Sequence, residues 1–198
     1  MEHATEQPQY IETFVYGGMF DPPTIMHRNI AQGAIDLARQ NHADVWIMPS
    51  GTRIDKPGAI NIDRRLEYID ALVADVDATD VNLSVYTKEL YRGVPVETFD
   101  TVLELNDTYP DRRFTWVFGA DSTETMGDWH MGPWLLANLS MLLVERDGYA
   151  INPQVRHAQS LKVAQQAISS TAVRNGYAAG DDVSWMLTPH VQPFFSRI

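Results

Sequence analysis

The chain has 198 residues, of which 44% are hydrophobic and 21% charged; it is long and apolar enough to fold around a core, which excludes disorder as the starting interpretation. Its 26 acidic residues outnumber the 15 basic ones, and the resulting formal net charge of −11 argues against a protein that binds the backbone of a nucleic acid. The chain contains no cysteine, which excludes disulfide frameworks, thiolate zinc sites and thiol nucleophiles.

The N-terminal segment, residues 1–10, is polar and is predicted to be a flexible tail. It lacks the basic and apolar regions of a secretory signal, and the longest apolar stretch, residues 133–145, is too short to span a bilayer. Because a protein without cysteine also suits a reducing compartment, we expect a cytoplasmic protein that does not bind membranes. Residues 11–198 contain no linker, repeat or shift in composition and are predicted to form a single domain.

Five short apolar runs are predicted to be buried strands: residues 13–16, 44–50, 81–86, 114–119 and 139–145. Between them, residues 28–40, 62–75 and 96–110 have apolar side chains three and four positions apart, as in amphipathic helices, and the last helix should stop before Pro110. This alternation predicts an α/β fold, a Rossmann-like doubly wound parallel sheet that binds ligands at the carboxyl ends of its strands. After residue 150 the alternation weakens, and a mixture of short helices and turns predicts a small C-terminal helical appendage.

The stretch GGMFDPPTIMH, residues 17–27, joins the first predicted strand to the first predicted helix. Gly17 and Gly18 would let backbone N–H groups approach a ligand closely, although two glycines also occur in ordinary turns. Thr24 and His27 are three residues apart, so at the start of a helix they share one face, where N–H groups and the helix dipole attract a phosphate. The alternative is that Thr24 is only a helix cap and His27 a solvated surface residue.

A second cluster, ISSTAVR at residues 168–174, lies late in the chain. Ser169, Ser170 and Thr171 offer hydroxyl groups and the N–H groups of a helix start, and Arg174 follows one turn later, within reach of the same anion. The alternative is an N-cap signal followed by an exposed surface cation.

Together these two segments resemble the signature segments of the nucleotidylyltransferase superfamily, a glycine-rich strand end with (H/T)xxH and a C-terminal ISSTxxR. The sequence between them is similar to the bacterial nicotinate-nucleotide adenylyltransferases. The similar stretches are MPSGTRIDKP (48–57), VETFDTVLEL (96–105), YPDRRFTWVFGADS (109–122) and LLVERDGY (142–149). The resemblance runs in order from about residue 12 to the C-terminus and so covers nearly the whole chain.

The resemblance implies an ATP site. In it Thr24 and His27 would contact the phosphates, and Ser170 and Arg174 would close on the triphosphate from the other side; His27, Thr24 and Arg174 would be the catalytic residues. Gly119 and Asp121 would lie at the ribose, although Asp121 also suits a helix cap. The complete ATP-binding set that the resemblance implies is Gly17, Gly18, Phe20, Thr24, His27, Gly119, Asp121, Ser169, Ser170 and Arg174.

The resemblance also implies a site for a pyridine mononucleotide, formed by Lys56, Thr98 and Trp129, with Trp129 stacking on the ring and Lys56 holding phosphate. The alternative from residue type alone is that Trp129 is a half-buried core aromatic and Lys56 a solvated loop charge.

The activity implied by the resemblance is transfer of AMP from ATP to nicotinate mononucleotide, which gives deamido-NAD and pyrophosphate in NAD biosynthesis. Mg²⁺ would enter with ATP and would have no protein ligands of its own. Neither nucleic acid nor membrane is expected as a partner, and a homo-oligomer stays open. The alternatives are adenylyl or cytidylyl transfer to another small acceptor, such as nicotinamide mononucleotide or phosphopantetheine, and a nucleotide-binding module that has lost catalysis.

Two positions depart from the pattern of the close family, which has histidine where Thr24 stands and glycine where Met26 stands. Threonine at the first position is normal elsewhere in the superfamily. At the second position, either the nucleotide shifts, or the Met26 side chain points away from it, or the substrate differs.

Overall fold

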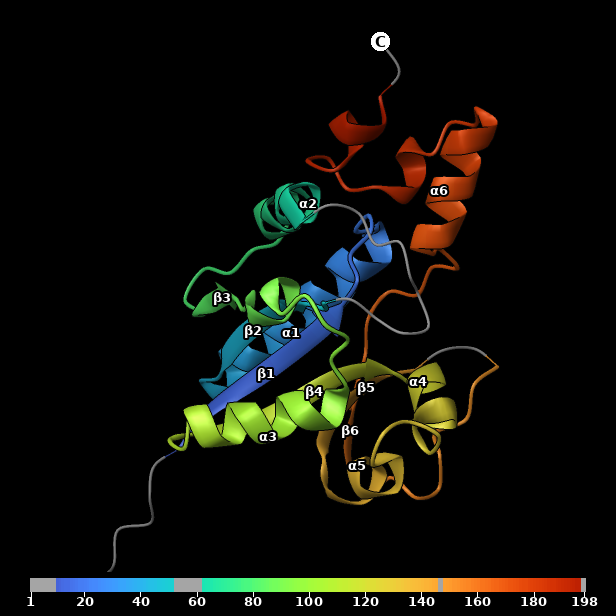
Figure 1. Ribbon diagram of the computed structural model, residues 1–198. Coiled ribbons are helices and arrows are strands. Elements are labelled where there is room, and N and C mark those ends of the chain that lie inside the picture. The colour runs from blue at the N-terminus through green and yellow to red at the C-terminus, as the bar shows by residue number, and fades with distance from the viewer. Residues whose placement is uncertain (1–9, 52–61, 146–147, 197–198) are drawn as a thin grey trace, which may run out of the picture.

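The computed structural model describes residues 10–51, 62–145 and 148–196. Its centre is a parallel sheet of six strands in the order β3-β2-β1-β4-β5-β6 (Figure 1). The strands are β1 (Ile11–Gly18), β2 (Asp44–Pro49), β3 (Leu83–Val85), β4 (Arg112–Gly119), β5 (Ser140–Val144) and β6 (His157–Leu161). The order reverses between β1 and β4, as in doubly wound folds, so the predicted fold class is confirmed.

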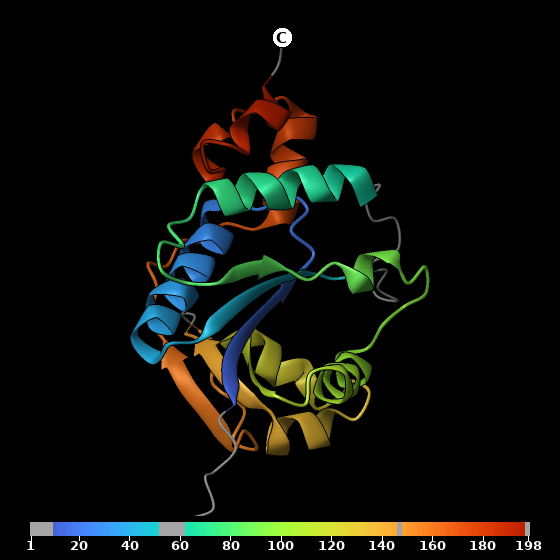
Figure 2. The same ribbon diagram turned by 90° about the vertical axis from the view of Figure 1, so that its left-hand side faces the viewer.

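Helices cover both faces of the sheet. On one face lie α1 (Ile25–Asn41) and α2 (Ile62–Ala74), and on the other lie α3 (Thr98–Thr108), α4 (Ala120–Met126) and α5 (Gly132–Asn138). Figure 2 shows α1 and α3 on opposite sides of the strands. Side chains alternate along β1 accordingly: Phe14 and Tyr16 belong to the core beneath α1, and Val15 belongs to the core beneath α3. Because both faces are buried, the central strands are continuous apolar runs in the sequence.

The C-terminal part is the predicted helical appendage. It consists of α6 (Ser170–Ala179) and two short 3₁₀ helices, η2 (Ser184–Met186) and η3 (Gln192–Phe195), while another 3₁₀ helix, η1 (Lys88–Tyr91), follows β3. The appendage has a small core of its own, which rests on α2 through Ala71 and contains Val173, Val183, Leu187 and Val191. Figure 1 shows this segment beyond α2, away from the sheet.

The structure corrects the predicted elements in three places. Strand β6 was not predicted, because His157, Ala158, Gln159 and Ser160 are exposed at the edge of the sheet and form no apolar run. Helices α4 and α5 were missed because each has only seven residues, too few for a periodic pattern. Helix α1 begins at Ile25 instead of residue 28, which makes Thr24 its N-cap.

Two other expectations concern the ends of the chain and membranes. Except for Tyr10, the predicted tail lies outside the described residues, and the division into a tail and a single domain stays a prediction. Within the described parts of the chain, no helix combines the length and the apolar character needed to cross a membrane.

Candidate active site

Gly17 and Gly18 form the carboxyl end of β1, which lies between β2 and β4 at the point where the strand order reverses. A Cβ atom on Gly18 would lie 3.0 Å from the Phe20 ring, so a side chain at this position would displace that ring. Phe20 adopts a left-handed φ of 47° and is almost completely buried. Its ring packs edge-on against His27, with ring centroids 5.4 Å apart. Phe20 therefore lies beneath the site and supports His27.

Thr24 and His27 form a local pair at the N-terminus of α1. The ring Nδ1 of His27 accepts a hydrogen bond from the Thr24 backbone N–H (3.1 Å) and lies 2.8 Å from the Thr24 hydroxyl oxygen. Because Nδ1 accepts from the backbone N–H, the proton of the neutral imidazole is on Nε2, which can donate to a ligand. The pair thus holds a donor at the helix end where anions are favoured.

Met26 lies between these two residues in the sequence, but its side chain is in the first core, with only 3% of the residue exposed. Of the three outcomes considered from the sequence, the structure shows that Met26 points into the core.

Helix α6 lies against the loop between β1 and α1 (Figure 1). Ser169 is its N-cap and accepts a hydrogen bond from the Ala172 N–H (3.1 Å). The Ser170 hydroxyl donates to the Pro22 carbonyl oxygen (2.9 Å), and Arg174 Nη1 donates to the Asp21 carbonyl oxygen. The structure therefore places the second predicted cluster against the loop that carries the first, and the N-termini of two helices meet there.

Asp21 lies at the junction of these elements and is buried, with a cis peptide bond to Pro22. Its Oδ2 atom is 3.8 Å from Arg174 Nη1, and its Oδ1 atom has no hydrogen-bond partner. Burial raises the pKa of the Asp21 carboxyl above its usual range, and the positive charges of Arg174 and Arg65 oppose that shift.

The next strand end carries the predicted ribose residues. Gly119 ends β4, which pairs with β1 through Val117 and Tyr16, and it is the N-cap of α4. Asp121 lies in the first turn of α4 and is partly buried. These positions adjoin Gly17 and Gly18 at the end of β1 across the switch point, where the fold class predicts a ligand.

The two described residues of the predicted acceptor site lie among aromatic side chains. Thr98 begins α3, and its neighbour Phe99 packs edge-on against His130, with centroids 5.7 Å apart. Trp129, the residue before His130, is half-buried and packs against Phe118 near the end of β4, with centroids 6.1 Å apart. The beginning of α3 and the loop after α4 are thus brought together beside the end of β4.

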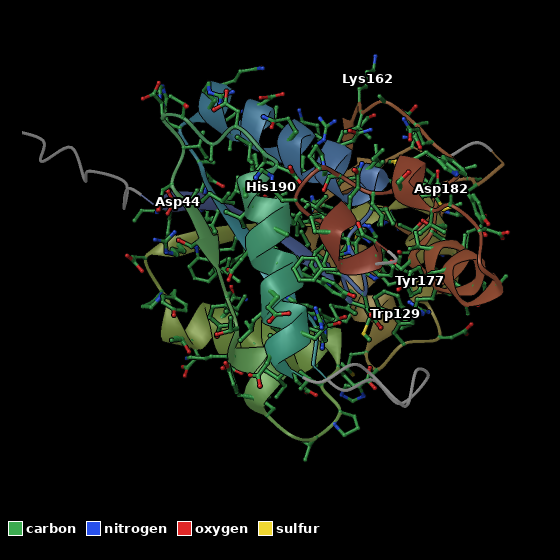
Figure 3. All side chains as sticks on the ribbon, turned by 90° about the horizontal axis from the view of Figure 1, so that it is seen from above. Asp44, Trp129, Lys162, Tyr177, Asp182 and His190 are labelled. Carbon is green, nitrogen blue, oxygen red and sulfur yellow. The ribbon has the colours of Figure 1, made fainter. Side chains whose placement is uncertain are left out.

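Figure 3 shows Asp44 at the left edge of the molecule and Trp129 to the right of its centre. Asp44 is the first residue of β2, so Trp129 lies on the side to which the carboxyl ends of the strands point. Lys56, the third predicted acceptor residue, lies outside the described residues. In the described part of the chain, no group of three or more His, Asp or Glu side chains could hold a metal ion.

The arrangement combines two helix N-termini, a glycine-rich strand end and an aromatic-lined strand end, which suits a ligand with phosphates and a flat ring. A family model described as cytidylyltransferase-like matches residues 15–176. The chain belongs to the cytidylyltransferase-like family. Both predicted motifs lie within the matched range.

Proteins similar to this chain over most of its length have a more specific name than the family. A protein of Bacillus cereus (strain G9842) called probable nicotinate-nucleotide adenylyltransferase is 29% identical over 188 residues, covering 92% of this chain and 94% of the relative. One of Exiguobacterium sibiricum with the same name is 31% identical over 179 residues, covering 89% and 91%. The resemblance inferred from the motifs is therefore confirmed.

Solved structures support the fold. The structure described as Plasmodium falciparum nicotinic acid mononucleotide adenylyltransferase complexed with NaAD superposes with a TM-score of 0.77 at 16% identity, covering 93% of this chain and 96% of that one. A putative nicotinate-nucleotide adenylyltransferase from Vibrio parahaemolyticus gives a TM-score of 0.62 at 21% identity, covering 92% and 90%.

The structure adds one residue that sequence reasoning missed. Arg65 on α2 is only 3% exposed and donates hydrogen bonds to the carbonyl oxygens of Met19 (3.0 Å) and Ser50 (2.5 Å), which follow β1 and β2. The signal was present in the sequence: Arg65 is in phase with the buried Tyr68, Ile69 and Leu72, where a charged side chain needs a partner.

Proposed function

We propose that this protein is an adenylyltransferase that joins ATP and nicotinate mononucleotide to form deamido-NAD and pyrophosphate. One observation carries the proposal: Ser170 and Arg174 contact the loop that presents Thr24 and His27, so donors from both ends of the chain converge beside the glycine-rich end of β1. The names of the relatives support nicotinate mononucleotide as the acceptor.

In this reaction, a phosphate oxygen of nicotinate mononucleotide attacks the α-phosphorus of ATP in line. The bond from the α-phosphorus to the α,β-bridging oxygen breaks, and pyrophosphate leaves with its electron pair. Because the attacking phosphate is already ionised near neutral pH, the step needs no general base. Catalysis then depends on positioning the reactants and on neutralising the negative charge.

The local geometry suggests separate tasks for the donors. His27 would donate from Nε2 to the phosphate being transferred, where charge grows in the transition state. Arg174 has a side chain that is 45% exposed, so its guanidinium can reach the leaving pyrophosphate while Ser170 and the Asp21 carbonyl hold α6 against the loop. Gly119 and Asp121 would bind the ribose, and Thr98 and Trp129 the pyridine nucleotide.

Mg²⁺ would enter the site bound to the phosphate oxygens of ATP and would reduce the repulsion between the two substrates. The donor set around the site consists mainly of N–H groups, hydroxyl groups, imidazole and guanidinium, which suits a triphosphate that brings its own cation. A cytoplasmic location and the oligomeric state stay predictions.

The alternative of a binding module without catalysis would gain support if Met26, which stands where the close family has glycine, blocked the site. Burial in the core keeps the Met26 side chain off the partly exposed His27 ring, which supports an active enzyme. The choice between acid and amide forms of the acceptor depends on groups around the pyridine carboxyl.

The test is pyrophosphate release from ATP and Mg²⁺ with nicotinate mononucleotide, nicotinamide mononucleotide or phosphopantetheine supplied in parallel. We expect the fastest release with nicotinate mononucleotide. Release only with another acceptor would refute nicotinate mononucleotide as the acceptor and would leave adenylyl transfer as the reaction type. ATP binding without release from any acceptor would refute the enzymatic proposal.

A further inference from the structure

Arg65 joins two strand ends beneath the proposed site through its bonds to the Met19 and Ser50 carbonyls, and two buried carboxylates act on its charge. We refer to the three residues Arg65, Asp21 and Glu89 as the Arg65 cluster. Asp21 and Glu89 are each 7% exposed, and both carboxylates act electrostatically on the Arg65 guanidinium. Burial lowers the pKa of Arg65, and the two negative charges oppose that shift. Removal of Arg65 would therefore leave two buried carboxylates with less compensating charge and two strand-end carbonyls without their donor.

One side of this cluster faces the proposed ATP site. Arg65 donates to the Met19 carbonyl through both Nε (3.3 Å) and Nη2 (3.0 Å), and Met19 directly follows Gly18 at the end of β1. Asp21 extends the cluster to Arg174 on α6.

The other side faces the proposed acceptor site. Glu89 accepts a hydrogen bond from the Thr101 hydroxyl on α3 (2.5 Å), one turn after Thr98. The Glu89 backbone also lies against the end of β2, since a Cβ atom on Gly51 would be 2.3 Å from the Glu89 carbonyl oxygen. Arg65 reaches the same strand end through the Ser50 carbonyl.

We propose that Arg65 is a positioning residue that couples the two substrate sites, so that binding of one nucleotide tightens binding of the other. The inference rests on the proposed function and deepens it. A nucleotide bound against the loop after β1 would act on the Arg65 guanidinium through the Met19 carbonyl. Arg65 would pass this on to the end of β2 through the Ser50 carbonyl, and the Glu89 backbone beside Gly51, with its bond from Thr101, would then place α3 for the acceptor at lower cost. Neither substrate needs to contact Arg65.

The decisive quantity is the ratio of the ATP-site dissociation constants without and with saturating nicotinate mononucleotide, because coupling must be measured as an energy between two sites. The probe is the α,β-methylene analogue of ATP, which cannot release pyrophosphate, measured with Mg²⁺ by titration calorimetry. We expect a ratio of at least about five in the wild-type protein. In Arg65→Met the ratio should fall to about one.

Arg39→Met is the matched control. Arg39 also donates to two loop carbonyls, those of Asp77 and Thr79 (both 3.2 Å), but it lies at the far end of α1, where it pairs with Asp36. This variant should keep the wild-type ratio.

Two further variants decide the question if Arg65→Met does not fold. Thr101→Val keeps the shape of a buried side chain and removes the donor to Glu89, so the ratio should fall by at least about half. Arg65→Lys keeps the charge, but an ammonium group cannot bridge two carbonyls as a planar guanidinium does. The ratio of dissociation constants in this variant should therefore lie below that of the wild type.

A wild-type ratio near one overturns the coupling, as does an unchanged ratio in both Thr101→Val and Arg65→Lys. Pyrophosphate release by the wild-type protein tells the two failures apart. If release occurs with nicotinate mononucleotide and the ratio is one, only the coupling is wrong. If no acceptor supports release, the proposed function fails and the coupling fails with it.

Discussion

Met26→Ala tests whether the departure from the family pattern affects the core or the active site. The substitution removes three heavy atoms from a side chain that lies in the first core, next to the N-terminus of α1. At about 0.8 kcal/mol per buried methylene-sized group, the lost transfer free energy is about 2 kcal/mol. A cavity of about 70 Å³ would add about 1.5 kcal/mol if the core does not collapse. We expect the free energy of unfolding to fall by about 2–4 kcal/mol.

Urea denaturation followed by circular dichroism would measure this loss, which corresponds to a fall in Tm of about 4–16 °C for a chain of this length. The KM for ATP should change by less than about twofold at a temperature where the variant is folded, because the side chain points away from the Thr24–His27 face. Met131, which is 45% exposed, provides the control: Met131→Ala should cost less than about 0.5 kcal/mol. A stability loss below about 1 kcal/mol together with a clear fall in the KM for ATP would show that Met26 faces the nucleotide.

Three other predictions follow from the geometry of the site. His27→Ala should lower kcat by at least about tenfold and change the KM for ATP by less than about threefold, because the variant loses a donor used mainly in the transition state. Steady-state pyrophosphate release would measure both constants, and unchanged turnover would remove His27 from the mechanism. Arg174→Ala should raise the KM for ATP by about tenfold or more. The variant loses the proposed charge-assisted bonds to the triphosphate and the bond that joins α6 to the Asp21 carbonyl. An unchanged KM for ATP would place the triphosphate elsewhere. Because burial raises the folded-state pKa of Asp21 above the unfolded value of 3.8, this carboxyl binds its proton more tightly when the protein is folded, and its contribution to stability declines as the pH rises from about 4 through the folded pKa. In urea denaturation over pH 4–7, the free energy of unfolding of the wild type minus that of Asp21→Asn should therefore fall as pH rises, and a rising difference would contradict the assigned shift.

The sequence predicted the central sheet well because the central strands are buried on both faces. Such strands appear as apolar runs, as at residues 114–119, and the helices between them show a clear period. Strand β6 has no such signal: it lies at the edge, and only its last residue, Leu161, is buried. Its position depends on pairing with β5, which is a long-range contact that residue types do not report.

The candidate site was predicted unevenly for a similar reason. Thr24 and His27 are three residues apart, so their contact follows from helix geometry. Ser170 and Pro22 are 148 residues apart, and only the resemblance to a family suggested that their segments meet. The helical phase of Arg65 indicates that it is buried, but its partners could not be predicted. They are backbone carbonyl oxygens at two strand ends, and every residue has such an oxygen, so residue types do not identify them.

The small separate core of the appendage has a thermodynamic consequence. Helix α6 carries Ser170 and Arg174, but Val173 packs with Val183, Leu187 and Val191 in a small cluster. This cluster borders α2 at Ala71, and the segment is further attached by Ser170 and Arg174 to the loop after β1 and by Phe194 to Tyr68 on α2. A unit of this size can open while the sheet stays folded, since small clusters have lower opening free energies than central strands. Heating should therefore abolish ATP binding before it abolishes the secondary structure, and amide protons of α6 should exchange faster than those of β1. A nucleotide at about 100 times its Kd that binds only the closed form would slow that exchange by about two orders of magnitude, so the substrate would itself stabilise the C-terminal end.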